Sequence, residues 1–179
     1  VLTSPFRRAV QTASAVAEVV GEAAIVDERL REKEFGVLDR LTRAGITERF
    51  PAEVEARNRL GKFYYRPPSG ESWCDVIQRL RGVMIELQHN YPRERVLVVG
   101  HQVVVLCFRY LIEKLDEREL LEIDRAADVA NGSITSYAFD PAANGGRGGL
   151  ALAAYNSVDA LADAGATVTA ASDTPRPAS

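Results

Sequence analysis

Apolar and polar positions alternate along this chain in a way that predicts helices separated by short strands. The clearest helix follows Ser72, and Asp75 stands three residues later in a capping-box pattern. Apolar residues then recur at steps of three and four: Trp73, Val76, Ile77, Leu80, Val83, Met84 and Leu87. Pro92 ends this helix. A second helix is predicted over residues 5–21, with Ser4 as its N-cap.

The β-branched run within residues 95–100 predicts a buried strand that delivers His101 to its carboxyl end. An apolar helix pattern over residues 103–115 follows directly. In open parallel sheets, ligands collect at the carboxyl ends of strands, where helix N-termini point free N–H groups outward. His101, one of two histidines in the chain, is therefore placed for chemistry on an anionic group.

The rest of the chain predicts further short elements, which together indicate the fold class. Residues 25–26 form a short strand or an extended link, and short helices are predicted over residues 42–50 and from about residue 52. Residues 133–139 and 149–155 predict the two strands of a hairpin. Strands that alternate with helices favour an α/β fold layered around a mainly parallel sheet.

Composition limits the class of protein. With 179 residues and 46% hydrophobic content, residues 1–156 are expected to form one domain, and the Ala-, Ser- and Pro-rich residues 157–179 a disordered tail. A net charge of −3 gives no reason to expect nucleic acid or a membrane as a partner. The start lacks both an initiator Met and a signal pattern, and Cys74 and Cys107 lack disulfide or metal-ligand spacing. We expect a cytoplasmic protein.

Three clusters carry residues that suit a phosphate. Arg7 and Arg8 stand in the first turn of a helix, where the dipole disfavours cations; a bound anion would remove that cost, and the alternative is a solvated pair. Glu32, near an apolar Phe and a Gly, is a candidate proton donor, or one charge in a surface run. His101 is a third candidate, or a satisfied core histidine. His89 lies off the apolar stripe of its helix and is expected to be solvated.

These clusters, in this order, resemble the histidine phosphatase superfamily, which is also called phosphoglycerate-mutase-like. Its Ser-x-x-x-Arg-Ala-x-x-Thr segment is matched by Ser4, Arg8, Ala9 and Thr12. Its acid-donor segment is matched by Leu30, Glu32, Phe35 and Gly36, its second-histidine segment by Gly100 and His101, and its Pro-x-Gly-Glu-Ser stretch by residues 68–72. The resemblance covers roughly residues 1–156 and implies a three-layer αβα sandwich with a mainly parallel sheet.

By this resemblance, Arg8 and His101 bind the phosphoryl group, Ser4 is one of the residues that bind the substrate, and Glu32 protonates the leaving oxygen. Fixed cationic donors stabilise the charge on a phosphoryl group in flight, and a neutral histidine that attacks it forms a phosphohistidine. The resemblance implies no metal and no cofactor, which agrees with the absence of ligand-spaced carboxylates or histidines in the sequence.

The chain departs from the family pattern at its nucleophile. The family's nucleophile is the histidine of an Arg-His-Gly motif at the end of its first strand, and neither His89 nor His101 lies in such a motif. The chain begins at a point that matches the end of the family's second strand. We interpret this as a truncated sequence, because Arg8, Glu32 and His101 are all retained, and we expect no turnover from these residues alone.

The substrate is expected to be a small phosphorylated metabolite. Residues Arg57, Lys62 and Gln102 stand at or near positions that hold the sugar bisphosphate in proteins resembling fructose-2,6-bisphosphatase. Three further positions differ from that pattern, at Leu106, Trp73 and Arg43. The loss of one bidentate arginine argues against a bisphosphate anchored at both ends and for another phosphomonoester. The alternative for Arg57 and Lys62 is an exposed face.

Two alternative functions stay open. One is a mutase of the phosphoglycerate type, although the chain is compact where such mutases carry a longer insertion after the acid-donor segment. The other is a non-catalytic protein that binds a phosphorylated ligand in the remaining site. The oligomeric state stays open, because no exposed apolar stripe stands out.

Overall fold

The computed structural model describes residues 1–168 of the chain. These divide into two compact units, the first made of Val1–Asp39 and Ala52–Phe108, and the second of Arg40–Pro51 and the described residues from Arg109 onward. Both units draw on the residues expected to form one domain, so the boundary at residue 156 stays a prediction.

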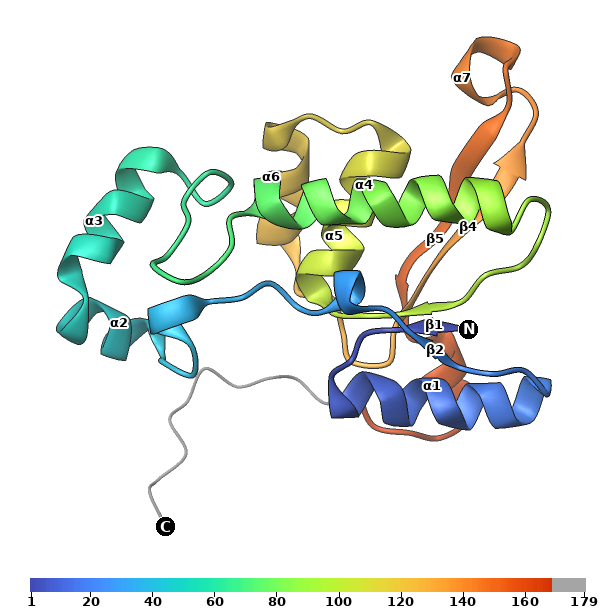
Figure 1. The fold of residues 1–179 in the computed structure, drawn as a ribbon, viewed down its shortest axis with the longest axis horizontal. Coiled ribbons are helices and arrows are strands. Elements are labelled where there is room, and N and C mark those ends of the chain that lie inside the picture. Colours follow the sequence, from blue (N-terminus) through green and yellow to red (C-terminus); the bar gives the residue numbers. More distant parts are fainter. Residues whose placement is uncertain (169–179) are drawn as a thin grey trace. The chain divides into compact units, whose positions relative to one another are not determined.

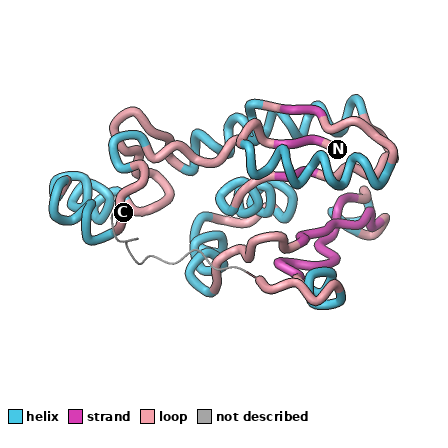
Figure 2. Tube along the Cα trace, turned by 90° about the horizontal axis from the view of Figure 1, so that it is seen from below, coloured by secondary structure: helices cyan, strands magenta, loops and turns pink. Residues whose placement is uncertain are grey.

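The first unit is built on a three-stranded parallel sheet. Strand β1 (Leu2–Thr3) lies in the middle, between β2 (Ile25–Val26) and β3 (Val98–Val99), and the three strands lie side by side in Figure 2. The Leu2 N–H donates to the carbonyl of Leu97 at 2.8 Å. This confirms the predicted parallel sheet, although β3 is shorter than the strand predicted over residues 95–100.

Helices cover both faces of this sheet. Figure 1 shows α1 (Arg7–Val20) along one side and α4 (Trp73–Asn90) on the other. The small residues Ala9, Ala13 and Ala17 are the buried positions of α1, while α4 buries a larger apolar stripe: Trp73, Val76, Ile77, Leu80 and Val83. These helix, sheet and helix layers confirm the α/β sandwich, and they place the core of this unit on the two apolar helix faces.

The start of α4 follows the predicted capping box. The Ser72 side chain accepts from the backbone N–H of Asp75, and the Asp75 carboxylate accepts from the Ser72 N–H at 2.7 Å. The start of α1 differs from the prediction. Phe6, not Ser4, is its N-cap residue, and the Ser4 hydroxyl accepts from the Phe6 N–H at 3.3 Å. Ser4 sits two residues too early to cap the helix, because residues 4–6 are still leaving the sheet edge.

The other helices of the chain are short. Thr42, the first residue of the predicted segment 42–50, caps α2, because its hydroxyl accepts from the Gly45 N–H at 3.1 Å. The bounds are η1 Glu28–Leu30, η2 Gly36–Leu38, α2 Arg43–Arg49, α3 Pro51–Leu60, α5 Gln102–Glu113 and α6 Glu117–Ala126. Within residues 1–168, no helix is both long enough and apolar enough to cross a bilayer.

The second unit contains the predicted hairpin. Strands β4 (Ile134–Asp140) and β5 (Gly149–Ser157) pair in antiparallel register, with the short helical turn α7 (Ala143–Gly146) at the tip. Of the segment predicted to be disordered from residue 157, Ser157 ends β5 and Asp159–Asp163 form a short helix, α8, which corrects that prediction for these six residues. Residues 169–179, the rest of the predicted tail, lie outside the described residues.

Two glycines allow a close backbone approach in the first unit. Gly36 has a φ of 55°, and a Cβ added there would lie 2.1 Å from the carbonyl oxygen of Pro68. A Cβ on Gly70 would lie 2.8 Å from the carbonyl oxygen of Glu34. The loop before η2 and the segment before α4 therefore pack backbone against backbone, and a side chain at either position would separate them.

We predict that Gly36→Ala lowers the free energy of unfolding more than Gly61→Ala. Both residues have positive φ, at 55° and 81°, but nothing lies within 4 Å of an added Cβ at Gly61. The left-handed backbone alone costs about 1–2 kcal/mol for alanine, and the clash at Gly36 adds about 1–3 kcal/mol. Urea denaturation of both variants measures the difference, and equal losses would contradict the close approach.

Candidate active site

The site is centred on His101, which follows β3 and precedes the first residue of α5. Its side chain is buried, at 8% exposure. The Arg8 Nη2 donates to His101 Nδ1 at 3.0 Å, and His101 Nε2 lies 2.7 Å from the Ser4 Oγ. A guanidinium group can only donate, so Nδ1 carries the lone pair and the Nε2–H donates to the serine. Residues about 95 positions apart in the chain thus share one hydrogen-bonded chain.

The parallel pairing of β1 with β3 produces this arrangement. The Ser4 N–H donates to the carbonyl of Val99 at 2.9 Å, so Ser4 and His101 leave neighbouring strands at the same edge of the sheet. The helix that follows β1 then places Arg8 beside the imidazole. The centroid of the Phe6 ring lies 5.1 Å from the centroid of the His101 ring, and it lies 5.1 Å from Cζ of the Arg8 guanidinium.

Glu32 lies on the loop between η1 and η2, close to the start of α5. Its Oε1 accepts from the Lys33 N–H at 2.8 Å, and its Oε2 lies 3.5 Å from the N–H of Val103, two residues after His101. Burial raises the pKa of Glu32, and the two N–H groups and the charges of Arg8 and Arg79 oppose the rise only in part. A carboxyl group with a raised pKa holds a proton that it can donate near neutral pH.

The imidazole of His101 is uncharged at neutral pH. Burial lowers its pKa to about 4, and the positive charges of Arg8 and Arg79 act in the same direction. Arg8 is itself an exposed residue, so an anion from solvent can reach its guanidinium group. The site therefore combines an accessible cation, a neutral imidazole and a carboxyl group biased toward its protonated form. Such a set can bind an oxyanion and give a proton to a leaving group.

The structure brings together four of the seven predicted site residues, namely Ser4, Arg8, Glu32 and His101. Gln102 is the first residue of α5, next to His101. Arg57 lies on α3, and the Lys62 ammonium lies 5.3 Å from the centroid of the Trp73 ring. A role for Ser4, Gln102, Arg57 and Lys62 in binding substrate stays a prediction.

Two residues near the site were not predicted as part of it. Arg79 and Glu71 form an ion pair, Nε to Oε1, at 2.9 Å, and both side chains are largely buried, at 13% and 12% exposure. The charge of Arg79 acts on both Glu32 and His101. Glu71 belongs to the Pro-x-Gly-Glu-Ser stretch that matches the family, so the sequence contained a hint that it lies near the site. Arg79 adjoins Leu80 of an apolar helix stripe, and no sequence pattern indicated it. Within the described residues, no group of His, Cys, Asp and Glu side chains could hold a metal ion.

Comparisons with known proteins agree on one family. The family model described as histidine phosphatase superfamily (branch 1) matches residues 1–145. The chain is 37% identical over 118 residues to 6-phosphofructo-2-kinase/fructose-2,6-bisphosphatase of Gallus gallus, which covers 65% of this chain and 23% of that protein. The human type 4 protein of the same name is 35% identical over 119 residues, or 66% of this chain and 24% of its own. The chain thus spans about a quarter of the length of these relatives.

Solved structures show the same fold. The mycobacterial glucosyl-3-phosphoglycerate phosphatase with inorganic phosphate aligns with a TM-score of 0.72 at 26% identity, covering 88% of this chain and 76% of that one. YhfR of Bacillus stearothermophilus aligns with a TM-score of 0.70 at 27% identity, covering 88% and 73%. Both similarities extend over most of the described residues.

We predict a loss of stability on acidification that depends on His101. The unfolded imidazole takes up a proton below its usual pKa of 6.5, whereas the folded one stays neutral to about pH 4. The free energy of unfolding should therefore fall by about 3 kcal/mol between pH 6.5 and 4 from this group alone. Urea denaturation across this range should give a flatter profile for His101→Gln than for the wild type.

His89→Gln is the matched control, because His89 is exposed on the last turn of α4. It should keep the wild-type slope. If His101→Gln and His89→Gln both keep that slope, His101 is not a buried neutral imidazole.

Proposed function

Because the chain belongs to branch 1 of the histidine phosphatase superfamily, we propose that it is a phosphatase that hydrolyses a small phosphomonoester through a phosphohistidine, without a metal. The observation that supports this most is the hydrogen bond from Arg8 to His101, with the Glu32 carboxyl group beside the same helix start. A cation, an imidazole and a proton donor in one place are the groups that phosphoryl transfer requires.

In the proposed binding step, the phosphoryl oxygens accept hydrogen bonds from the Arg8 guanidinium. A guanidinium group can donate to two phosphate oxygens at once, and these hydrogen bonds are strengthened by its charge. Arg8 turns from His101 Nδ1 to the anion, and the freed Nδ1 can take up a proton and donate to another phosphoryl oxygen. The Ser4 hydroxyl keeps the imidazole in place through the Nε2–H bond.

In the proposed chemical step, a bond forms between a histidine nitrogen and phosphorus while the P–O ester bond breaks. The Glu32 proton moves to the leaving oxygen, so the product departs as an alcohol. Water then attacks the phosphohistidine, and the Glu32 carboxylate takes its proton as inorganic phosphate is released. The raised pKa of Glu32 suits both halves of this cycle.

The nucleophile in this proposal is a histidine that the 179 residues do not contain. His101 donates to Ser4 through Nε2, and its Nδ1 faces Arg8 and takes up a proton in the proposed binding step, so neither nitrogen is left to attack. His89 is exposed at the end of α4. Residues 1–179 alone are therefore expected to bind phosphate but not to turn over a phosphomonoester. An in-frame Arg-His-Gly in the coding sequence upstream of Val1 would support the enzyme, and a start codon there without one would favour a phospho-ligand-binding protein.

We propose a small phosphorylated metabolite as the substrate, with Arg57, Lys62 and Gln102 holding its non-reacting part. The names of the similar proteins, fructose-2,6-bisphosphatase and glucosyl-3-phosphoglycerate phosphatase, support a phosphorylated sugar or glycerate derivative. Trp73 and Leu106 carry no charge and are buried, at 1% and 0% exposure, so neither can hold a second phosphate. A cytoplasmic location is part of the same proposal and rests on the spacing of the cysteines.

We predict that Arg8→Gln weakens the binding of inorganic phosphate to residues 1–179 about 10- to 100-fold. Hydrogen bonds to charged groups contribute about 1.5–3 kcal/mol, which corresponds to this range. Arg7→Gln is the matched control, since it removes a neighbouring exposed arginine on the same helix, and it should change the affinity less than threefold. Calorimetric titration with phosphate measures both, and equal losses would contradict a specific role for Arg8.

We predict that Glu32→Gln, in a chain that includes the upstream nucleophile, slows hydrolysis of an alkyl phosphate about 10²- to 10⁴-fold. The same variant should slow hydrolysis of p-nitrophenyl phosphate much less, because nitrophenolate leaves without a proton. Quenching in alkaline detergent should trap a phosphoenzyme with both substrates, and acid should then release its phosphate, as expected for a phosphohistidine. An equal loss on the two substrates would show that Glu32 is not the proton donor, and dependence on a bisphosphate primer would indicate a mutase.

A further inference from the structure

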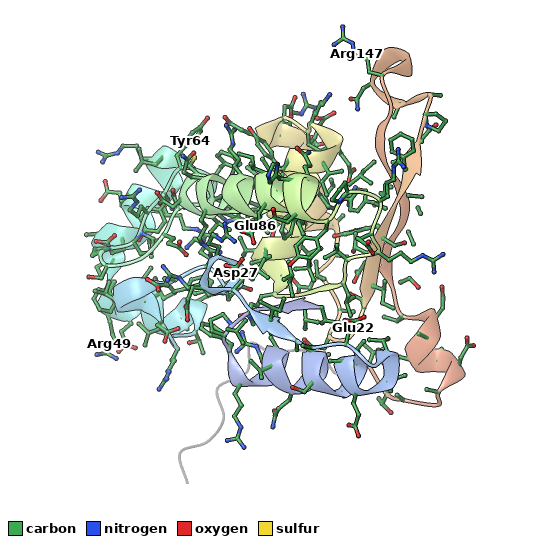
Figure 3. All side chains as sticks on the ribbon, turned by 45° about the vertical axis from the view of Figure 1, so that its right-hand side comes forward. Glu22, Asp27, Arg49, Tyr64, Glu86 and Arg147 are labelled. Atoms are coloured by element: carbon green, nitrogen blue, oxygen red, sulfur yellow. The ribbon has the colours of Figure 1, made fainter. Side chains whose placement is uncertain are left out.

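The loop that carries Glu32, which we call the acid loop (residues 27–38), is held at several points within the first unit. At its N-terminal end, the Arg29 guanidinium pairs with Asp27 on the loop and with Glu86 on α4. Figure 3 shows Asp27 and Glu86 close together on these two elements. These two ion pairs fix the start of the acid loop. Arg29 lies three residues before Glu32, so its ion pairs do not hold the residues that follow Glu32.

Arg79 of α4 makes a second, more buried connection. Its Nε and Nη2 donate to the two carboxylate oxygens of Glu71 at 2.9 and 3.1 Å, and its Nη1 donates to the carbonyl of Arg29. All donor nitrogens of this guanidinium are therefore directed at fixed acceptors. A fork of this kind sets both the distance and the orientation of the groups that it joins.

Glu71 passes this constraint to the far side of Glu32. Its Oε2 also accepts from the Glu34 N–H at 3.1 Å, and its own N–H donates to the carbonyl of Glu34 at 2.9 Å. Arg79 thus binds the acid loop three residues before Glu32 directly, and two residues after it through Glu71. Glu32 lies between these two points, which limit how far its backbone can move from the start of α5.

The charge of Arg79 serves the same arrangement. This charge lowers the pKa of Glu71, to which Arg79 is paired, and opposes the rise in the Glu32 pKa that burial causes. Lysine would keep the positive charge but could not make the two-point contact with Glu71 while it also reaches the Arg29 carbonyl. Charge and geometry can therefore be separated by substitution.

We propose that Arg79 is a positioning residue, which holds the acid loop through Glu71 and Arg29 so that the Glu32 carboxyl group stays beside Arg8 and His101. The inference rests on the proposed function, because it assigns a purpose to the position of Glu32. It adds a residue that touches neither the phosphoryl group nor the leaving group.

The test is Arg79→Lys in residues 1–179, with Arg81→Lys, an exposed arginine on the same helix, as the matched control. Hydrogen–deuterium exchange of the Glu34 amide should become about tenfold faster in Arg79→Lys and stay unchanged in Arg81→Lys. Carbon NMR of the Glu32 carboxyl group should show its pKa falling toward the ordinary value, because a looser loop admits water while the charge is kept.

The Ser4 amide, which donates to Val99 inside the sheet, reports global stability in the same experiment. A role limited to stability would speed exchange at Ser4 and Glu34 by the same factor and leave the pKa of Glu32 in place, and this result would overturn the proposal. Glu71→Gln is the second variant, and the same measurements on it alone test the proposal if Arg79→Lys does not fold. In the double variant, exchange of the Glu34 amide should be less than twofold faster than in either single variant, since both changes break one connection.

Phosphate titration of the wild type keeps the two proposals apart. If the wild type binds no inorganic phosphate, the proposed function fails whatever Arg79 does. If it binds phosphate and Arg79→Lys changes neither the Glu34 amide exchange nor the Glu32 pKa, only the role of Arg79 fails.

Discussion

The hydrogen bond from Arg8 to His101 is the contact on which the account of this protein depends. It exists because β1 and β3 are parallel neighbours, so that the chain leaves both strands at one edge of the sheet and starts a helix from each. Ser4 and Arg8 come from one of these exits and His101 from the other. Neither the sheet nor the helices alone bring these groups together, but their joint geometry places a cation against an imidazole.

Burial then sets the protonation states that the proposed chemistry needs. The same desolvation that keeps His101 neutral also favours the protonated form of Glu32, because each group loses more hydration when it is charged. The charges of Arg8 and Arg79 oppose the rise in the pKa of Glu32 and add to the fall in the pKa of His101. Arg79 does so while it is paired with Glu71, so one buried ion pair shapes the electrostatics of the site and the path of the acid loop.

Much of this could be predicted from the sequence, where local rules determine local structure. The capping box at Ser72 and the β4–β5 hairpin follow from patterns a few residues long. Motif order also gave Arg8, Glu32 and His101, but not how they contact one another. Ser4 fits the pattern of an N-cap and is instead held by His101, a contact 97 residues away that no local rule contains. Arg79 was missed for the same reason, since its partners lie on two other segments.

The most direct test of the convergence of Arg8, His101 and Glu32 is a crystal structure of residues 1–179 with orthovanadate, a phosphoryl mimic. The account predicts one vanadate with its oxygens within hydrogen-bond distance of the Arg8 guanidinium and the His101 ring, and with Glu32 facing it. Vanadate bound elsewhere, or an Arg8 still paired with His101 at saturating vanadate, would contradict it.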